Sequence, residues 1–240
     1  MTGPAASRRR FLHTQIPTPA HEAERQSLVE GLYEAIKARI VDGRLAPGAK
    51  VLEAELALAL GTSRTPVREA LIRLQSEGFL EPAPRGLRVT PLSAQDIREI
   101  NEVLACLEAE AAERLARRHP GPAEMALLDA AIATMDRALE GEDRAAWAEA
   151  DYRFHRLIIE LCGNRHLAQI ARLFLDKAHR VRLLTTPLRE RPVYANVNHA
   201  AVVEAVRRGD PQTALEIHRA HKRRWSAELE GLLRRLGLPG

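Results

Sequence analysis

Four residues of the chain have side chains that suit a divalent metal ion. The segment DYRFH places Asp151 and His155 four residues apart on one helix face, a common arrangement for two metal ligands. His199 and His221 follow in apolar helical segments. If they converge, one carboxylate and three imidazoles favour a borderline divalent ion. The alternative is a satisfied polar pair together with core histidines, because sequence alone does not establish convergence.

A second group of residues suits an anionic partner. The segment SRTPVREALIRL (63–74) places Arg64 and Arg68 on one face of the opening turns of a helix. A helix N-terminus already carries positive partial charge, so these arginines cost stability unless an anion lies nearby. Arginine binds phosphate or reads guanine, and Ser63 and Thr65 can donate to phosphate oxygens. The alternative is a surface helix with solvated arginines.

The elements around these arginines predict a winged helix-turn-helix over residues 27–90. A capping box of Ser27 and Glu30 begins a first helix, and Thr65 with Pro66 begins a third. The segment FLEPAPRGLRVTPL is typical of a hairpin whose tip carries Arg85. The helices are expected at 27–42, 53–60 and from about 65 to 77, and the hairpin at 79–92.

From residue 93 onward the pattern is that of long amphipathic helices separated by short Gly- and Pro-bearing breaks. The fold class is therefore mainly α, an N-terminal winged helix-turn-helix followed by an all-helical bundle over residues 93–235. The helices of this bundle are expected at 93–118, 122–140, 143–162, 166–184, 191–208 and 210–235.

Composition limits the class of protein. The net charge is +4, and residues 1–90 hold 13 Lys and Arg against 10 Asp and Glu, so the basic excess lies mainly in the N-terminal part. No apolar run approaches the ~18 residues of a membrane span. Cys106 and Cys162 lie in apolar helical patterns, which favours buried free thiols and a cytoplasmic location. Residues 1–26 lack an apolar h-region and are typical of a disordered arm.

The segment LGTSRTPVREALIRLQSEGFLEPAPRGLRV (60–89) resembles the DNA-binding domain of the GntR family of bacterial transcription regulators. The resemblance extends over roughly residues 27–90. It implies that Arg64, Thr65 and Arg68 contact double-stranded operator DNA. It also implies that the wing around Arg85 and Gly86 reaches the minor groove.

Residues 93–235 resemble the FCD effector domain of the FadR-type GntR subfamily. The resemblance implies that Asp151, His155, His199 and His221 bind Zn, Ni or Mn, and that a small organic acid completes the coordination. Asn164 matches a pocket-lining position, although a helix-capping role is an equal alternative. One departure weakens the expectation of a carboxylate effector: an arginine common in relatives is replaced by Leu104.

Together these features predict a ligand-responsive regulator, a repressor, that binds a near-palindromic operator as a homodimer. Two alternatives are a ligand-independent dimeric DNA-binding protein and a metal-dependent hydrolase. The sequence offers no Ser/His/Asp set, no Gly-rich phosphate loop and no HExxH motif for an enzyme. An apolar stripe with Ile97 and Ile100 is a candidate dimer face, although core packing explains it equally well.

Overall fold

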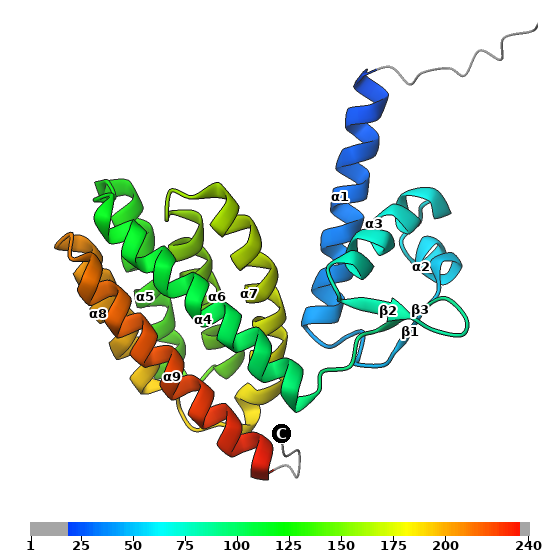
Figure 1. Cartoon of the computed structure of the whole chain (residues 1–240). Helices are drawn as coiled ribbons and strands as arrows, with labels where there is room; N and C mark the ends of the chain where they lie inside the picture. Colours follow the sequence, from blue (N-terminus) through cyan, green and yellow to red (C-terminus); the bar gives the residue numbers. More distant parts are fainter. Residues whose placement is uncertain (1–18, 236–240) are drawn as a thin grey trace, which may run out of the picture.

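The computed structural model describes residues 19–235, which fold into an N-terminal winged helix-turn-helix and an all-helical second domain (Figure 1). The predicted fold class is confirmed. The first domain contains α1 (Pro19–Val41), β1 (Lys50–Val51), α2 (Glu53–Ala59), α3 (Arg64–Ser76), β2 (Leu80–Pro82) and β3 (Leu87–Val89).

The first helix is longer than predicted. It begins at Pro19, so residues 19–26, expected in a disordered arm, are helical, and Ser27 lies inside the helix instead of capping it. The segment before Ser27 contains Ala, Glu, Arg and Gln, which are good helix formers and extend the helix past the expected cap. Residues 1–18 of the predicted arm lie outside the described residues.

The core of the first domain is formed by one face of each helix. Ile36, Ile40, Val67 and Leu74 are fully buried, and they pack with Phe79 beside the sheet. The small sheet is antiparallel with the order β1-β3-β2, and Leu80 pairs with Val89. The third strand, β1, extends the predicted two-stranded hairpin and anchors the wing to the domain.

The second domain consists of helices packed into one bundle (Figure 1). A capping box of Ser93 and Asp96 begins its first helix, as the segment SAQD predicts. Most boundaries lie within two residues of the expected ones. The elements are α4 (Ala94–Arg117), α5 (Pro122–Glu140), α6 (Arg144–Glu160), α7 (Arg165–Thr185), the 3-10 turn η1 (Thr186–Leu188), α8 (Val193–Arg207) and α9 (Pro211–Arg235).

The two domains contact each other through α1, α7 and the connecting segment. Lys37 Nζ lies 3.0 Å from Asp176 Oδ2, and the Tyr152 hydroxyl donates to Asp176 Oδ1 at 2.7 Å. Arg180 Nη1 donates to the carbonyl oxygen of Thr90 at 2.9 Å. Helix α7 therefore contacts the DNA-binding domain directly.

The burial of the two cysteines and of the Ile97–Ile100 stripe differs in part from the sequence-based expectation. Cys162 is buried, but Cys106 is exposed, because its position on α4 faces away from the core. Ile97 and Ile100 are buried within the chain, so core packing accounts for that stripe. Within residues 19–235, no helix combines the length and apolar character that crossing a bilayer requires.

Candidate functional site

The start of α3 presents a polar surface. Ser63 is the N-cap residue, and α3 begins at Arg64, one residue before the predicted Thr65 cap. Ser63, Arg64, Thr65 and Arg68 are all exposed, and the Ser63 side chain makes no capping hydrogen bond. The opposite face of α3 is buried in the core, so these four side chains are held on a rigid element and directed outward.

Glu53 on α2 forms ion pairs with both arginines of this surface, which leaves a net positive charge. Arg64 Nε lies 3.1 Å and Arg68 Nε 3.5 Å from the Glu53 carboxylate, while the two arginine side chains remain 70% and 71% exposed. Such exposed pairs contribute only about 0–1 kcal/mol. A phosphate can therefore replace Glu53 at little cost, and the glutamate keeps the arginines aligned without a ligand. Sequence reasoning did not single out Glu53.

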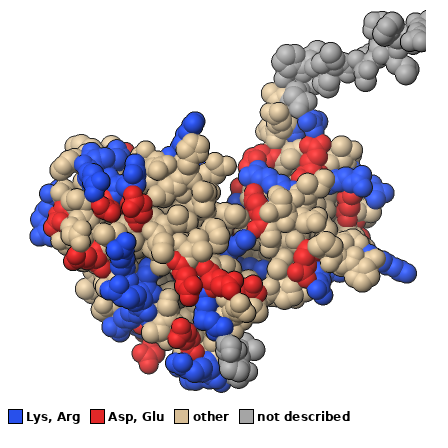
Figure 2. Space-filling model, viewed as in Figure 1, with Lys and Arg blue, Asp and Glu red and all other residues tan. Residues whose placement is uncertain are grey.

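The wing presents a second basic position. Arg85 and Gly86 are exposed at the tip between β2 and β3, where the Ala83 amide donates to the Gly86 carbonyl oxygen at 3.1 Å. Basic side chains project from the edge of this domain that faces away from the helical bundle (Figure 2, right). The wing and the start of α3 are thus the predicted DNA-contacting elements.

We expect Gly86→Ala to distort the wing. Gly86 has φ +81°, and a Cβ atom there would lie 2.8 Å from the Val51 carbonyl oxygen and 2.9 Å from Leu52 Cδ2. Alanine at positive φ costs roughly 1–2 kcal/mol before the clash is counted. Urea unfolding should show this loss of stability. Gly31→Ala is the control, because a Cβ atom there meets nothing within 4 Å; equal stability of the two variants would contradict the account.

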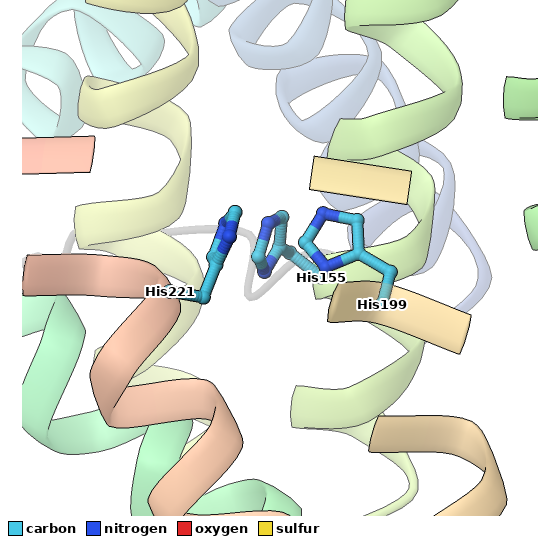
Figure 3. A group of neighbouring side chains, drawn as sticks. All are labelled: His155, His199 and His221. Carbon is cyan, nitrogen blue, oxygen red and sulfur yellow. The ribbon is translucent and has the colours of Figure 1, made fainter. Parts of the chain in front are cut away.

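The four predicted metal ligands converge inside the second domain. Asp151 and His155 come from α6, His199 from α8 and His221 from α9, and each is less than 9% exposed. The three imidazoles face a common space (Figure 3), where one ring nitrogen from each lies within 4.8 Å of the others. His199 Nε2 lies 2.8 Å and His155 Nε2 lies 3.7 Å from Asp151 Oδ1.

The charge state of these groups fits a divalent cation. Burial lowers the pKa of His199 to about 4 despite the neighbouring carboxylate, so its imidazole is neutral at pH 7. Burial also holds the pKa of His221 well below its ordinary value. Burial alone would raise the pKa of Asp151, but Arg182 and His155 outweigh it and hold that pKa well below its usual range.

Unpartnered atoms support the same conclusion. Nδ1 of His199 and Nδ1 of His221 are buried without a hydrogen-bond partner. Neutral imidazoles and one carboxylate are the donors that Zn, Ni and Mn accept. A cation held between His199 and Asp151 would take the place of the proton that they share. The residues present therefore fit the metal ion that the resemblance implies.

A second buried cluster adjoins the first, and sequence reasoning missed it. Glu108 on α4 is fully buried. Its carboxylate lies 3.1 Å from His155 Nδ1 and 3.2 Å from His218 Nε2, and it also forms a close ion pair with Lys222. Burial would raise the pKa of Glu108, but His155 and Lys222 hold it well below its usual value. Glu108 thus lies beside Nδ1 of His155, whereas Asp151 lies beside Nε2 of the same ring.

We expect Glu108→Gln to weaken Zn²⁺ binding about 10- to 100-fold, the usual effect of losing a carboxylate that orients a metal-binding histidine. The neutral amide no longer fixes the tautomer of His155, and it leaves Lys222 without a counter-ion. Competition with a chromophoric chelator measures the affinity. Glu110→Gln, an exposed site two residues away on α4, is the control; unchanged affinity in Glu108→Gln would refute this role.

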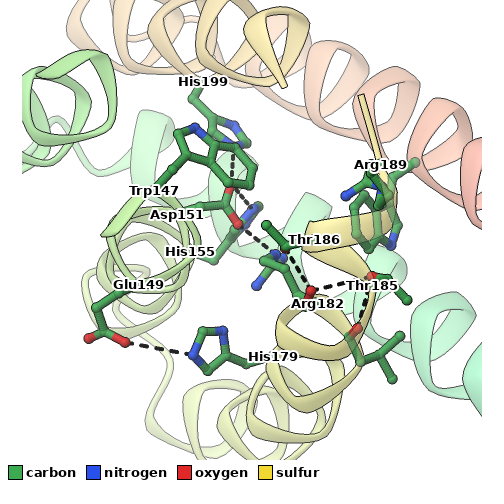
Figure 4. A network of polar contacts seen from close by, with 12 residues as sticks. Trp147, Glu149, Asp151, His155, His179, Arg182, Thr185, Thr186, Arg189 and His199 are labelled. Carbon is green, nitrogen blue, oxygen red and sulfur yellow. Dashed lines mark hydrogen bonds and ion pairs between the residues drawn. The ribbon is translucent and has the colours of Figure 1, made fainter. Parts of the chain in front are cut away.

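A pocket of about 380 Å³ reaches the metal ligands from the surface, and its walls include Asp151 and His221. Arg182 Nε lies 2.9 Å from Asp151 Oδ2 in an ion pair, as Figure 4 shows, and Arg182 Nη1 is buried without a hydrogen-bond partner. Arg189 stacks its guanidinium 3.7 Å from the centre of the Trp225 ring. The pocket therefore presents cationic groups beside the candidate metal centre.

Leu104 and Asn164, which the sequence analysis singled out, both have structural roles. Leu104, which replaces the expected arginine, is 1% exposed and packs in the core. Asn164 is the N-cap of α7, and its side-chain oxygen accepts from the amides of His166 and Leu167, both at 3.1 Å. It does not line the pocket that reaches Asp151. Capping accounts for Asn164, and ligand contact stays a prediction.

A winged helix-turn-helix joined to a helical bundle with a buried polar centre defines a class of DNA-binding regulators. Residues 28–86 match the model of bacterial regulatory proteins of the gntR family, and residues 99–224 match the FCD domain. The chain belongs to the GntR family of transcription regulators and carries an FCD effector domain. It is a regulator and not an enzyme.

Relatives agree with this assignment. A helix-turn-helix regulator from the TAR-I ttuE-ttuC' intergenic region of Agrobacterium vitis is 44% identical over 134 residues, covering 55% of this chain and 78% of that protein. A probable D-xylose utilization operon repressor of Paenarthrobacter nicotinovorans is 31% identical, covering 79% and 83%. The solved structure of E. coli McbR/YncC has the same fold, with a TM-score of 0.73, 24% identity and coverage of 84% and 96%.

Proposed function

We propose that this regulator is a cytoplasmic, ligand-responsive repressor that binds a near-palindromic operator as a homodimer. The exposed start of α3 carries the proposal for DNA, because it combines outward arginines with a buried opposite face. The proposed contacts are Ser63, Arg64, Thr65 and Arg68 on α3, with Arg85 and Gly86 on the wing. The repressor role is supported by the Paenarthrobacter relative, which is a probable repressor of a D-xylose utilization operon.

The proposed metal centre consists of Asp151, His155, His199 and His221, with Zn, Ni or Mn as the ion. The proposal is supported by their convergence in a buried space, where burial lowers the pKa values of His199 and His221 and the pKa of Asp151 lies well below its usual range. When bound, the metal supplies an anchor for an anionic ligand. Arg182 orients Asp151 from the other side, and Glu108 orients His155.

The proposed effector is a small organic acid that enters the 380 Å³ pocket. Leu104 removes one expected partner for a carboxylate, but Arg182 supplies a buried guanidinium with a free Nη1 atom beside Asp151. Arginine binds carboxylates bidentately. Arg189 and Lys222 add positive charge to the same walls, so an acid is favoured despite Leu104.

Ligand binding would bias the arrangement of the DNA-binding domains. Helix α6 carries both Asp151, in the proposed centre, and Tyr152, which bonds Asp176 at the domain contact. Asp176 in turn pairs with Lys37 of α1. A ligand that binds two arrangements with different affinities shifts their populations. This short path from centre to DNA-binding domain supports the switching role.

Selection of duplexes from a random library by the full-length protein tests the proposal. We expect enrichment of a motif with two inverted half-sites, separated by a whole number of helical turns between their centres. Enrichment of a single unsymmetrical half-site would contradict the dimer. The absence of any enriched motif would contradict operator recognition.

A further inference from the structure

A second cavity lies at the junction of the two domains, away from the proposed metal centre. Its volume is about 270 Å³. Gly78 and Phe79, just after α3, form one wall together with the connecting segment from Thr90 to Leu92. Helices α4 and α7 form the other walls. The metal ligands proposed above do not line it.

Arg180 places an incompletely satisfied cation in this cavity. It is 3% exposed, and its Nη1 atom donates to the Thr90 carbonyl oxygen, whereas Nη2 is buried without a partner. The hydroxyl oxygen of Thr90 is also buried and unpartnered. Within residues 19–235 no carboxylate lies within ion-pair distance of Arg180, and burial lowers its pKa. A buried charge without a counter-ion is costly, so an anion would be stabilising here.

Lys177, one helical turn before Arg180 on α7, adds a second cation. Its Nζ lies 5.9 Å from the Phe79 ring centre and 5.7 Å from that of Phe174. No carboxylate of the described chain lies within ion-pair distance of Lys177. Asp96, which also lines the cavity, is committed to Ser93 through the capping box.

The remaining acid of the cavity is also engaged. Glu99 is exposed and accepts a hydrogen bond from Gln95 at 2.8 Å. Burial lowers the pKa of Lys177, while Asp96 and Glu77 act in the opposite direction through space. Arg180 and Lys177 therefore line the cavity without an ion pair to a carboxylate of the described chain. The negative charges of Asp96 and Glu77 reduce the positive potential around Lys177.

The rest of the cavity is apolar. Phe79 and Ile100 are buried, and Leu92, Val103 and Phe174 contribute further carbon surface. The volume is below the ~300–1,000 Å³ usual for drug-sized ligands. Two cations beside apolar walls in a small space match an anion attached to a compact hydrophobic group.

We propose that this cavity is a second ligand site, which binds a small aromatic or branched aliphatic monocarboxylate. The carboxylate contacts Arg180 and Lys177, and the apolar group packs against Phe79 and Phe174. Because both domains form the walls, the ligand binds best when the domains hold this arrangement and therefore stabilises it. The site is independent of the metal centre.

Saturation-transfer NMR on full-length His199→Ala protein tests the site with the proposed metal centre disabled. The probes are benzoate, its uncharged analogue benzyl alcohol, and inorganic phosphate. We expect benzoate to bind at least tenfold more tightly than either control. Absence of benzoate binding would overturn the proposal, and equal binding of benzyl alcohol would overturn the carboxylate assignment. Equal binding of phosphate would overturn the proposed contact of an apolar ligand group with Phe79 and Phe174.

Two variants and one control in the same His199→Ala background locate the bound benzoate. Arg180→Gln removes the guanidinium and should abolish the benzoate signal, whereas Arg165→Gln, an exposed site on the same helix, should retain it. Val103→Phe fills the cavity from a half-exposed position without touching the Arg180–Thr90 bond, and it should also abolish the signal. Benzoate binding that survives both Arg180→Gln and Val103→Phe would place the ligand elsewhere and overturn the proposal.

If benzoate does not bind, the proposed metal-dependent regulation of DNA binding is still open to its own test. The response of the wild-type protein to Zn²⁺ is read in a separate titration with no benzoate present. A metal response without benzoate binding would refute the second site alone. Benzoate binding without a metal response would refute the metal centre alone.

Discussion

Replacing Arg64 and Arg68 together by alanine is expected to weaken binding of the selected operator duplex at least about 30-fold. Each arginine contact with a base or phosphate is worth roughly 1–3 kcal/mol, so the two losses add to about 2 kcal/mol or more. The folded state should change little, because both side chains are about 70% exposed and pair only with Glu53.

Fluorescence anisotropy at fixed salt measures this loss. Arg117→Ala is the matched control, because Arg117 is 68% exposed and paired with Glu113, but lies on α4 in the helical domain. The control should bind the operator as tightly as wild type. Circular dichroism should show unchanged helical content in each variant. Undiminished operator binding by the double variant would refute the assignment of α3 as the recognition helix.

His199→Ala is expected to abolish the thermal stabilisation that Zn²⁺ gives to the wild-type protein. At a free Zn²⁺ concentration 100 times the dissociation constant, metal binding stabilises the native state by about 2.7 kcal/mol. For a chain of this size that corresponds to a rise in Tm of roughly 5–11 °C. Removing one imidazole from the buried set removes this gain at the same Zn²⁺ concentration, because three ligands hold the ion less firmly.

Each protein is compared with its own chelator-treated form, because the substitution also removes the stacking of His199 on Phe154, whose ring centres are 4.4 Å apart. His166→Ala is the control, since His166 is exposed on α7 and lies outside the cluster. It should show the wild-type response to Zn²⁺. A full response in His199→Ala would show that the four residues are packing groups and not a metal centre.

Most helices could be predicted from the sequence, because capping residues and the spacing of apolar residues act over only a few positions. The Ser93 and Asp96 capping box forms as the segment SAQD indicates, and the burial of Val67 and Leu74 follows from helical spacing. The start of α1 was missed because helix-forming residues before Ser27 extend the helix past a plausible cap. Helix ends depend on small competing preferences and are therefore the least determined feature.

The site was predicted only in part, because burial depends on contacts between distant segments. The convergence of Asp151, His155, His199 and His221 follows the family pattern, and the structure brings them together. The sequence does not indicate the ionic partners of Glu108, since Lys222 and His218 lie more than 100 residues away. A glutamate on the same helical face as the buried Leu104 was the one available indication.

The arginines of the pocket were missed for the same reason. Arg182 lies in a strongly basic segment of α7 that suggests a solvated face, yet it is 4% exposed because Asp151 neutralises it. Its anionic partner lies on a different helix, which helical spacing along α7 does not indicate. Sequence reasoning therefore found the residues that could bind a metal but not those that position them.

The most direct test of the account is the affinity of the full-length protein for its selected operator, measured by anisotropy with chelator-treated and Zn²⁺-loaded protein. Coupling between two sites is typically 1–3 kcal/mol. We therefore predict that Zn²⁺ changes operator affinity at least about fivefold in the wild-type protein and leaves it unchanged in His199→Ala. Superimposable curves for metal-free and metal-loaded wild type would contradict a metal centre that controls DNA binding.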